Sequence, residues 1–153
     1  MSARPRLAEL MGLEAHPEGG WYARTWTAAP TLTPPGYPDA RPSATAIHYV
    51  LGAGESSAWH RVRSDELWLF HRGAALSLSL GGDGPAPSDT PTDVVLGGRV
   101  ESGELPQVLV PARHWQRARP LPRPEDADGP DGGAVLVSCV VSPGFDFADF
   151  ELA

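Results

Sequence analysis

Cysteine is nearly absent from this sequence, with Cys139 its one example among 153 residues. A single cysteine excludes an intrachain disulfide and a zinc site built on several thiolates. Its apolar neighbours Val137 and Val141 favour a buried, inert thiol over a reactive one.

Long apolar runs and an excess of basic charge are also missing. No run approaches the ~18 apolar residues that span a bilayer, and the first 20 residues lack the apolar core of a signal peptide. We therefore expect a cytoplasmic protein that does not bind membranes. The 19 acidic residues outnumber the 12 basic ones, for a net charge of -7. Such a surface repels phosphate backbones, which disfavours nucleic-acid binding.

The composition is globular and rich in turns. Hydrophobic residues make up 41% of the chain and charged residues 20%, while the 17 glycines and 17 prolines predict many turns. We find no internal repeat and no domain boundary, so we expect a single domain over residues 1–153.

Alternating patterns predict that most of the chain forms strands. Strands are expected at 21–27, 43–51, 76–80, 93–96 and around 108–110, with the apolar run 134–141 buried on both faces. Leucines and a methionine within 4–13 predict one short helix. Together these features favour an all-β sandwich or barrel with an N-terminal helix.

Three segments are harder to interpret. Residues 28–42 carry five prolines and predict a long loop, either a flap over a pocket or a partner, or a plain surface excursion. The acidic, proline-rich stretch 120–133 is expected to lack order. In 142–152, Phe145 and Phe147 alternate with Asp146, which predicts an edge strand packed by its phenylalanines.

The stretch from Gly54 to Gly73 is where a chemical site is expected. His60 shares one face of a predicted strand with Val62, and Glu66 shares a face of the next strand with two aromatic residues. A bend at 63–65 separates the two strands. This arrangement brings an imidazole and a carboxylate onto one inner wall, as a polar point in an apolar pocket.

The same stretch resembles a known motif. The spacing Gly54-x5-His60-x-Val62-x3-Glu66-x6-Gly73 resembles the first cupin motif, with Val62 where the second His would stand. HPEGGWY at 16–22, AWHRVRSDELW at 58–68, PQVLVPARHWQ at 106–116 and SPGFDFADFEL at 142–152 together resemble the Cupin_5 (DUF985) branch. That branch is described as sugar-epimerase-like, a label that rests on fold. The resemblance implies a double-stranded β-helix, the cupin jelly roll, with a ligand-sized cavity between two sheets.

The second cupin motif is also altered. Gln116 occupies the position of its final His, as is usual in this branch, and Arg113 replaces the expected glycine. If that glycine serves a positive φ, Arg113 carries a steric cost there.

The resemblance makes a divalent metal possible but does not favour one. Cupins usually supply three His and one Glu, whereas this chain offers His60, Glu66 and the weak amide oxygen of Gln116. His48 restores a second nitrogen only if it faces the same cavity. We therefore expect no cofactor, with a divalent metal as the alternative.

A metal-free reaction is the other possibility. His60 titrates near neutral pH and can take a proton beside a carbonyl, with Glu66 orienting it. In sugar epimerases of this fold a His of the comparable strand is the base, which the resemblance carries to His60. Tyr49 is the candidate acid by strand location, and Gln116 the expected hydrogen-bonding group for the substrate. The alternative is a buried His60–Glu66 pair that serves structure alone.

Aromatic and basic side chains flank these residues. Trp59 and Trp68 are candidates for stacking on a ligand, with a place in the core as the alternative. Arg24, Arg61 and Arg63 are candidates for holding an anionic group, although Arg61 should face away from His60. The histidines beside the glycine-rich turns, His16 and His71, are expected to be exposed.

The sequence thus supports three functions. The first is a small-molecule-binding cupin, an isomerase or epimerase of a sugar-like or carbonyl substrate with His60 as base. The second is a ligand-binding or structural cupin without catalysis, and the third is a metal-dependent lyase or oxygenase. An exposed strand edge at 21–27 favours a homodimer.

Overall fold

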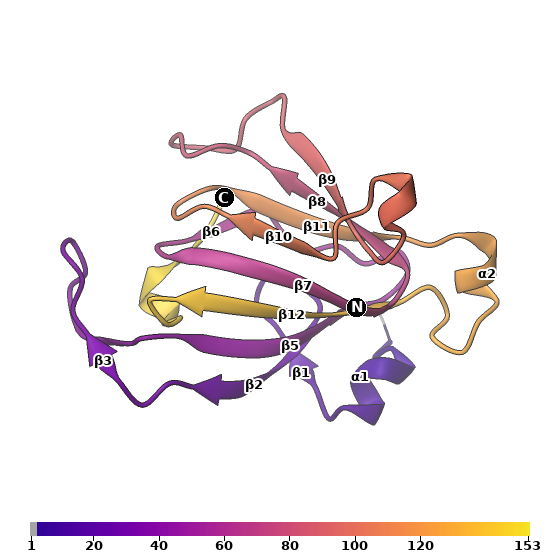
Figure 1. Ribbon diagram of the computed structural model, residues 1–153, viewed down its shortest axis with the longest axis horizontal. Coiled ribbons are helices and arrows are strands. Elements are labelled where there is room, and N and C mark those ends of the chain that lie inside the picture. Colours follow the sequence, from indigo (N-terminus) through magenta and orange to yellow (C-terminus); the bar gives the residue numbers. More distant parts are fainter. Residues whose placement is uncertain (1–2) are drawn as a thin grey trace.

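The structure, a computed structural model, describes residues 3–153, and Met1 and Ser2 lie outside the described residues. Two antiparallel sheets form the body of the molecule (Figure 1). The six-stranded sheet runs β1 (Glu14–Ala15), β2 (Trp21–Thr27), β5 (Thr45–Leu51), β12 (Val135–Ser142), β7 (Asp65–Gly73) and β10 (Gln107–Val110). The five-stranded sheet runs β13 (Phe150–Leu152), β6 (His60–Val62), β11 (Gln116–Leu121), β8 (Ala75–Leu80) and β9 (Thr92–Leu96). The predicted all-β jelly roll is confirmed.

The core lies between the two sheets. Buried residues alternate with more exposed ones along β12 and the first half of β7, because side chains on a strand point to opposite faces in turn. Trp68 and Tyr49 meet edge to face there, with ring centroids 5.9 Å apart. Cys139 is buried, as expected, and burial raises the pKa of its thiol well above the ordinary value.

The predicted N-terminal helix is present but shorter than expected. Helix α1 spans Arg6–Leu10, because Pro5 occupies its N-cap and Gly12 takes a positive φ of 66° just beyond its end. Its buried residue Leu7 packs with Val50 and Ala134, at the end of β5 and the start of β12. The helix therefore covers one end of the six-stranded sheet.

The segment 120–133, expected to lack order, is structured. Strand β11 continues to Leu121, and helix α2 follows at Pro124–Ala127. The Asp126 carboxylate accepts a hydrogen bond of 2.8 Å from the Arg123 backbone N–H, which fixes the first turn of the helix. A proline in the first turn favours a helix there, so the proline content did not imply disorder.

The C-terminal segment also differs from the prediction. Phe145 lies outside any strand, a 3-10 helix η2 spans Phe147–Asp149, and only Phe150–Leu152 forms strand β13. The Asp146 side chain caps η2 by accepting a hydrogen bond of 2.8 Å from the Ala148 N–H. Alternation of Phe and Asp therefore reflects a capped turn here, rather than a strand.

The long loop 28–42 holds a two-strand hairpin, β3 (Thr31–Leu32) with β4 (Arg41–Pro42), and supports the C-terminal segment. Arg41 is 4% exposed and makes a two-pronged ion pair with Asp149, at 2.8 and 3.0 Å. Arg63 binds the same carboxylate at 2.9 Å. The loop thus holds η2 in place through the Arg41–Asp149 ion pair. The residues of the loop do not line the main cavity described below.

Arg113 carries the steric cost that was expected if its position needs a positive φ. Its φ of 65° lies in the left-handed region, where a non-glycine residue costs roughly 1–2 kcal/mol. Its N–H donates to the Val62 carbonyl at 2.9 Å, which holds the turn before Gln116 in place.

Candidate active site

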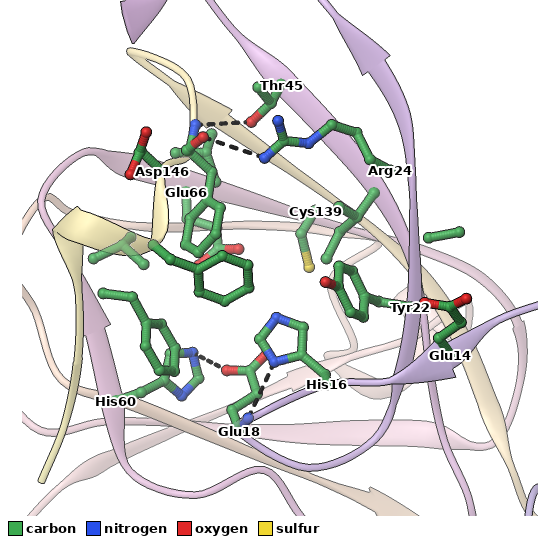
Figure 2. Close-up of a pocket in the computed structure, with 17 residues that line it drawn as sticks. Glu14, His16, Glu18, Tyr22, Arg24, Thr45, His60, Glu66, Cys139 and Asp146 are labelled. Carbon is green, nitrogen blue, oxygen red and sulfur yellow. Dashed lines mark hydrogen bonds and ion pairs between the residues drawn. The ribbon is translucent and has the colours of Figure 1, made fainter.

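A cavity of about 530 Å³ opens between the two sheets (Figure 2). Its walls come from β2, β5, β7 and β12 on one side and β6 on the other, with the N-terminal turn and the C-terminal segment at its ends. Segments far apart in sequence therefore contribute to one site. The wall combines apolar side chains with several ionisable groups, as ligand sites in proteins do.

The turn at 16–20 inserts Glu18 into this cavity. Gly19 and Gly20 take φ values of 99° and 77°, a region that glycine enters without steric cost. A Cβ on Gly20 would lie 2.6 Å from the Tyr49 hydroxyl oxygen, so only glycine fits against that ring. The Tyr49 hydroxyl donates to the Gly19 carbonyl at 2.5 Å, and the Ala58 N–H donates to the Glu18 carbonyl at 2.6 Å.

Glu18 forms a buried ion pair with His60. The His60 Nε2 lies 2.5 Å from the Glu18 Oε2, and both side chains are more than nine-tenths buried. Because the His60 Nδ1 donates to the Ala58 carbonyl at 2.8 Å, Nδ1 carries a hydrogen. One further proton must then lie between Nε2 and the carboxylate for the short contact to be attractive.

The pKa of His60 reflects this pairing. Burial alone would lower it, but the charge and hydrogen bond of Glu18, followed by the charge of Glu66, outweigh burial and raise the pKa above the ordinary value. His60 is therefore held as an imidazolium facing a carboxylate.

His16 is a second imidazole in the site, and the expectation that it is exposed is wrong. Its side chain is only 6% exposed, and its Nδ1 accepts the Glu18 backbone N–H at 3.1 Å. Burial lowers the pKa of His16, with Glu18 opposing and the charge of His60 adding to the decrease. His16 is thus neutral, with its other ring nitrogen turned away from Glu18 toward the cavity (Figure 2).

Glu66 supplies a second buried carboxyl group. Burial, and then the charge of Glu18, raise the pKa of Glu66 to about 7, although His60, Gln116 and Cys139 lower it in part. The Gln116 Nε2 donates to the Glu66 Oε1 at 2.7 Å, and the Gln116 Oε1 accepts from the Trp68 indole at 2.9 Å. This chain of hydrogen bonds fixes the position of the Glu66 side chain.

The structure brings some predicted site residues together and not others. His60 and Glu66 line the same cavity, as the alternation predicted. Gln116 is fully buried behind Glu66 and holds that carboxyl group, instead of lining the cavity. Tyr49 faces inward but is also fully buried outside the lining, with its hydroxyl committed to Gly19, and burial raises its pKa well above the ordinary value.

Three other candidates lie away from the cavity. Trp68 belongs to the core, which was the alternative for it. Trp59 precedes the inward-facing His60, so it points outward, under the Arg117 guanidinium at 4.8 Å. His48 likewise lies on the outer face of β5, beside His71 at a ring distance of 6.4 Å, and cannot restore a second nitrogen ligand.

The basic candidates divide in the same way. Arg24 lines the cavity and donates to the Phe145 carbonyl at 3.2 Å. Arg61 faces outward as expected, paired with Glu151 at 2.8 Å, and Arg63 is bound to Asp149. The site residues that sequence reasoning missed are Glu18, the buried His16, Tyr22 and the ring of Phe150. Their signals in the sequence are the segments HPEGGWY, for the first three, and SPGFDFADFEL, for Phe150, both of which carry the family resemblance.

The side chains present do not fit the divalent metal that many cupins hold. Such a metal would need the His60 Nε2, which Glu18 occupies, and Val62 replaces a second imidazole. The Gln116 amide is bound at both ends. Within residues 3–153, no three His, Cys, Asp or Glu side chains are grouped to hold a metal ion.

The buried Glu66 makes stability pH-dependent in a defined direction. Its pKa of about 7 in the folded protein exceeds its ordinary 4.5, so its stabilising contribution is full at low pH and is lost as pH rises through 7. Relative to Glu66→Gln, wild-type protein should therefore lose about 2 kcal/mol of unfolding free energy between about pH 5 and pH 8. Urea unfolding of both proteins across this range measures the difference.

The Gln variant keeps a side-chain oxygen for Gln116, so it is a matched control. Parallel stability curves for the two proteins would show that Glu66 titrates in its ordinary range, contrary to the site described here.

Comparison with known proteins places the chain in a family. The family model Cupin_5, Cupin superfamily (DUF985), matches residues 6–153. A hypothetical protein from Leishmania major is 35% identical, with a TM-score of 0.81 over 95% of this chain and 84% of that one. A protein from Shewanella oneidensis is 32% identical, with a TM-score of 0.78 over 100% of this chain and 85% of that one.

More distant similarity is limited to the fold. An oxalate decarboxylase from Lactobacillus farciminis is 12% identical, with a TM-score of 0.55 over 94% of this chain and 34% of that one. No curated protein matches the chain. Among residues 3–153, no helix has the length and apolar character to cross a membrane. The match over nearly the whole sequence shows that the chain belongs to the Cupin_5 (DUF985) family of the cupin superfamily.

Proposed function

We propose that the cavity binds a small carbonyl or sugar-like molecule and transfers protons on it, as an isomerase or epimerase does. The observation that carries this proposal is that two proton-holding groups face one cavity. These are Glu66, with a pKa of about 7, and the buried His60–Glu18 pair. Groups whose pKa values lie near neutral pH suit acid–base catalysis.

We propose different roles for the two groups. Ionised Glu66 takes the proton from the carbon next to the carbonyl. The shared proton of His60 and Glu18 is given to the carbonyl oxygen, which yields a neutral enol. Return of a proton to carbon completes an isomerisation or epimerisation. His60 acts through Glu18 in this scheme, because both of its ring nitrogens are already bound.

A ligand-binding cupin without catalysis is the second candidate. It is favoured by the same fact, that both His60 nitrogens are occupied within the protein. A buried ion pair can hold two segments together without any reaction. Of the three functions that the sequence supports, the metal-dependent one is weakest, since the donor set does not fit a metal.

Hydrogen exchange distinguishes catalysis from binding. A panel of aldoses, ketoses and 2-keto acids in deuterated buffer should show protein-dependent deuterium uptake at the carbon next to the carbonyl, followed by proton NMR. Glu66→Gln should reduce this rate by about 100-fold or more, since a positioned base contributes on that scale. The rate should rise with pH through about 7 as Glu66 ionises, and then fall as His60 loses its proton.

Glu55→Gln serves as a control, because Glu55 lies outside the cavity lining. Absence of uptake across the panel with wild-type protein would reject catalysis on these substrates in favour of binding alone.

We also propose that the chain forms a homodimer through the outer face of the six-stranded sheet. One row of outward side chains crosses five neighbouring strands and is apolar throughout. The row is Trp26, Ala46, Val140, Leu67 and Leu109. Trp26 and Leu109 are 51% and 52% exposed at its two ends. A second copy related by a two-fold axis would meet an identical apolar row.

Light scattering after size-exclusion chromatography tests the dimer. Wild-type protein should have the mass of two chains, and Leu109→Glu should have the mass of one, because it places a charge in the row. Leu152→Glu is the control, since Leu152 is 48% exposed on β13 of the other sheet and should leave the dimer intact. A wild-type mass of one chain would refute the proposal.

A further inference from the structure

We infer that the cavity selects a small organic cation, a molecule with an ammonium group beside its reactive or polar part, over anions of similar shape. This inference rests on the proposed function of the cavity as a small-molecule site and names the charge class of its ligand. Two separate features of the wall support it, namely its carboxylates and its aromatic rings.

Carboxylates outnumber cationic side chains in the cavity wall. The four acidic residues are Glu14, Glu18, Glu66 and Asp146, and the cationic ones are Arg24 and protonated His60. The charge of His60 is already balanced by Glu18. Arg24 is exposed at the rim and donates to the Phe145 carbonyl. The local potential is therefore negative, and like-charge repulsion disfavours an anionic ligand.

Figure 2 shows how this acidic wall is distributed. Glu18 and Glu66 are buried, and the exposed Asp146 lies in the C-terminal segment, across the cavity from Glu18. The histidine that could add positive charge, His16, has a lowered pKa and stays neutral near pH 7. The wall thus keeps an acidic excess at neutral pH, and that excess grows as Glu66 ionises.

Aromatic rings form the second feature. Besides the charged His60, five of them line the cavity: His16, Tyr22, Phe145, Phe147 and Phe150. The ring centroids of His16 and Tyr22 are 4.5 Å apart, and those of Phe145 and Phe147 are 4.9 Å apart. Phe147 is 48% exposed, so a ring surface remains available to a ligand. Ring faces carry negative partial charge and attract alkylammonium groups.

These two features disfavour a ligand that carries several negative charges. A phosphorylated or nucleotide-linked sugar would bring several negative charges to a wall with more carboxylates than cationic groups. A compact ammonium group would instead meet rings and carboxylates together. One cation–π contact of about 0.5–2 kcal/mol corresponds to a preference of roughly 2- to 30-fold.

Three probes of nearly identical shape test the inference. Choline carries a quaternary ammonium, 3,3-dimethylbutan-1-ol has carbon in place of that nitrogen, and 3,3-dimethylbutanoate carries a carboxylate. Binding is followed by chemical-shift titration of ¹⁵N-labelled protein. We expect choline to perturb cavity amides and to bind about fivefold or more tightly than the alcohol. The carboxylate should bind most weakly.

Variants assign the effect to the cavity wall. Phe147→Leu and Asp146→Asn should each reduce the preference for choline over the alcohol. Leu105→Ala is the control, because Leu105 is 48% exposed, as Phe147 is, but lies outside the cavity lining. Equal or tighter binding of the alcohol or the carboxylate would overturn the inference, and so would the absence of cavity perturbation by choline.

The test of the cation site is independent of the test of the proposed reaction. Choline has no carbonyl and no exchangeable carbon-bound proton, so its binding does not depend on catalysis. Choline binding without deuterium uptake on any carbonyl compound would reject the reaction and support the cation site. Deuterium uptake together with tighter binding of the carboxylate probe would support the reaction and reject the cation site.

Discussion

The ion pair between Glu18 and His60 is the interaction on which the site depends. It joins the N-terminal turn to the five-stranded sheet, where β6 contributes only three residues. Removing one partner would leave an uncompensated charge in a buried place, which typically costs 3–5 kcal/mol. The surrounding bonds from Tyr49 and Ala58 to the turn show how closely its backbone is held. The ion pair and these hydrogen bonds hold the N-terminal turn in place as one wall of the cavity.

A third ionisable group, Glu66, explains why the site can hold a proton near neutral pH. Glu66 lies close enough to Glu18 for the charge of Glu18 to disfavour the ionisation of Glu66, while His60 compensates only part of that repulsion. The hydrogen bonds from Trp68 through Gln116 keep Glu66 from turning away from this environment. Gln116, at the position of the final histidine of the second cupin motif, thus orients an acid in place of binding a metal.

The sequence predicted the fold and half of the site, for identifiable reasons. Period-two alternation placed His60 and Glu66 on inward faces, and the same rule applied to 45–51 would have excluded His48 once Tyr49 was placed inward. Glu18 was missed because it lies in a turn, where no periodicity indicates which way a side chain points. Gln116 was found, but its partner could not be, since contact between β11 and the Glu66 side chain depends on the closing of two sheets. The C-terminal phenylalanines alternate like a strand, although Asp146 caps a 3-10 turn instead.

The titration of Glu66 is the most direct test of the account. Protein labelled with ¹³C at the glutamate side-chain carboxyl carbons can be followed by NMR across the pH range, with Glu66 assigned by the loss of its signal in Glu66→Gln. We expect a midpoint of about 7, well above the ordinary 4.5. A midpoint at or below 4.5 would contradict it, because Glu66 would then be an ordinary ionised carboxylate with no proton to hold at neutral pH.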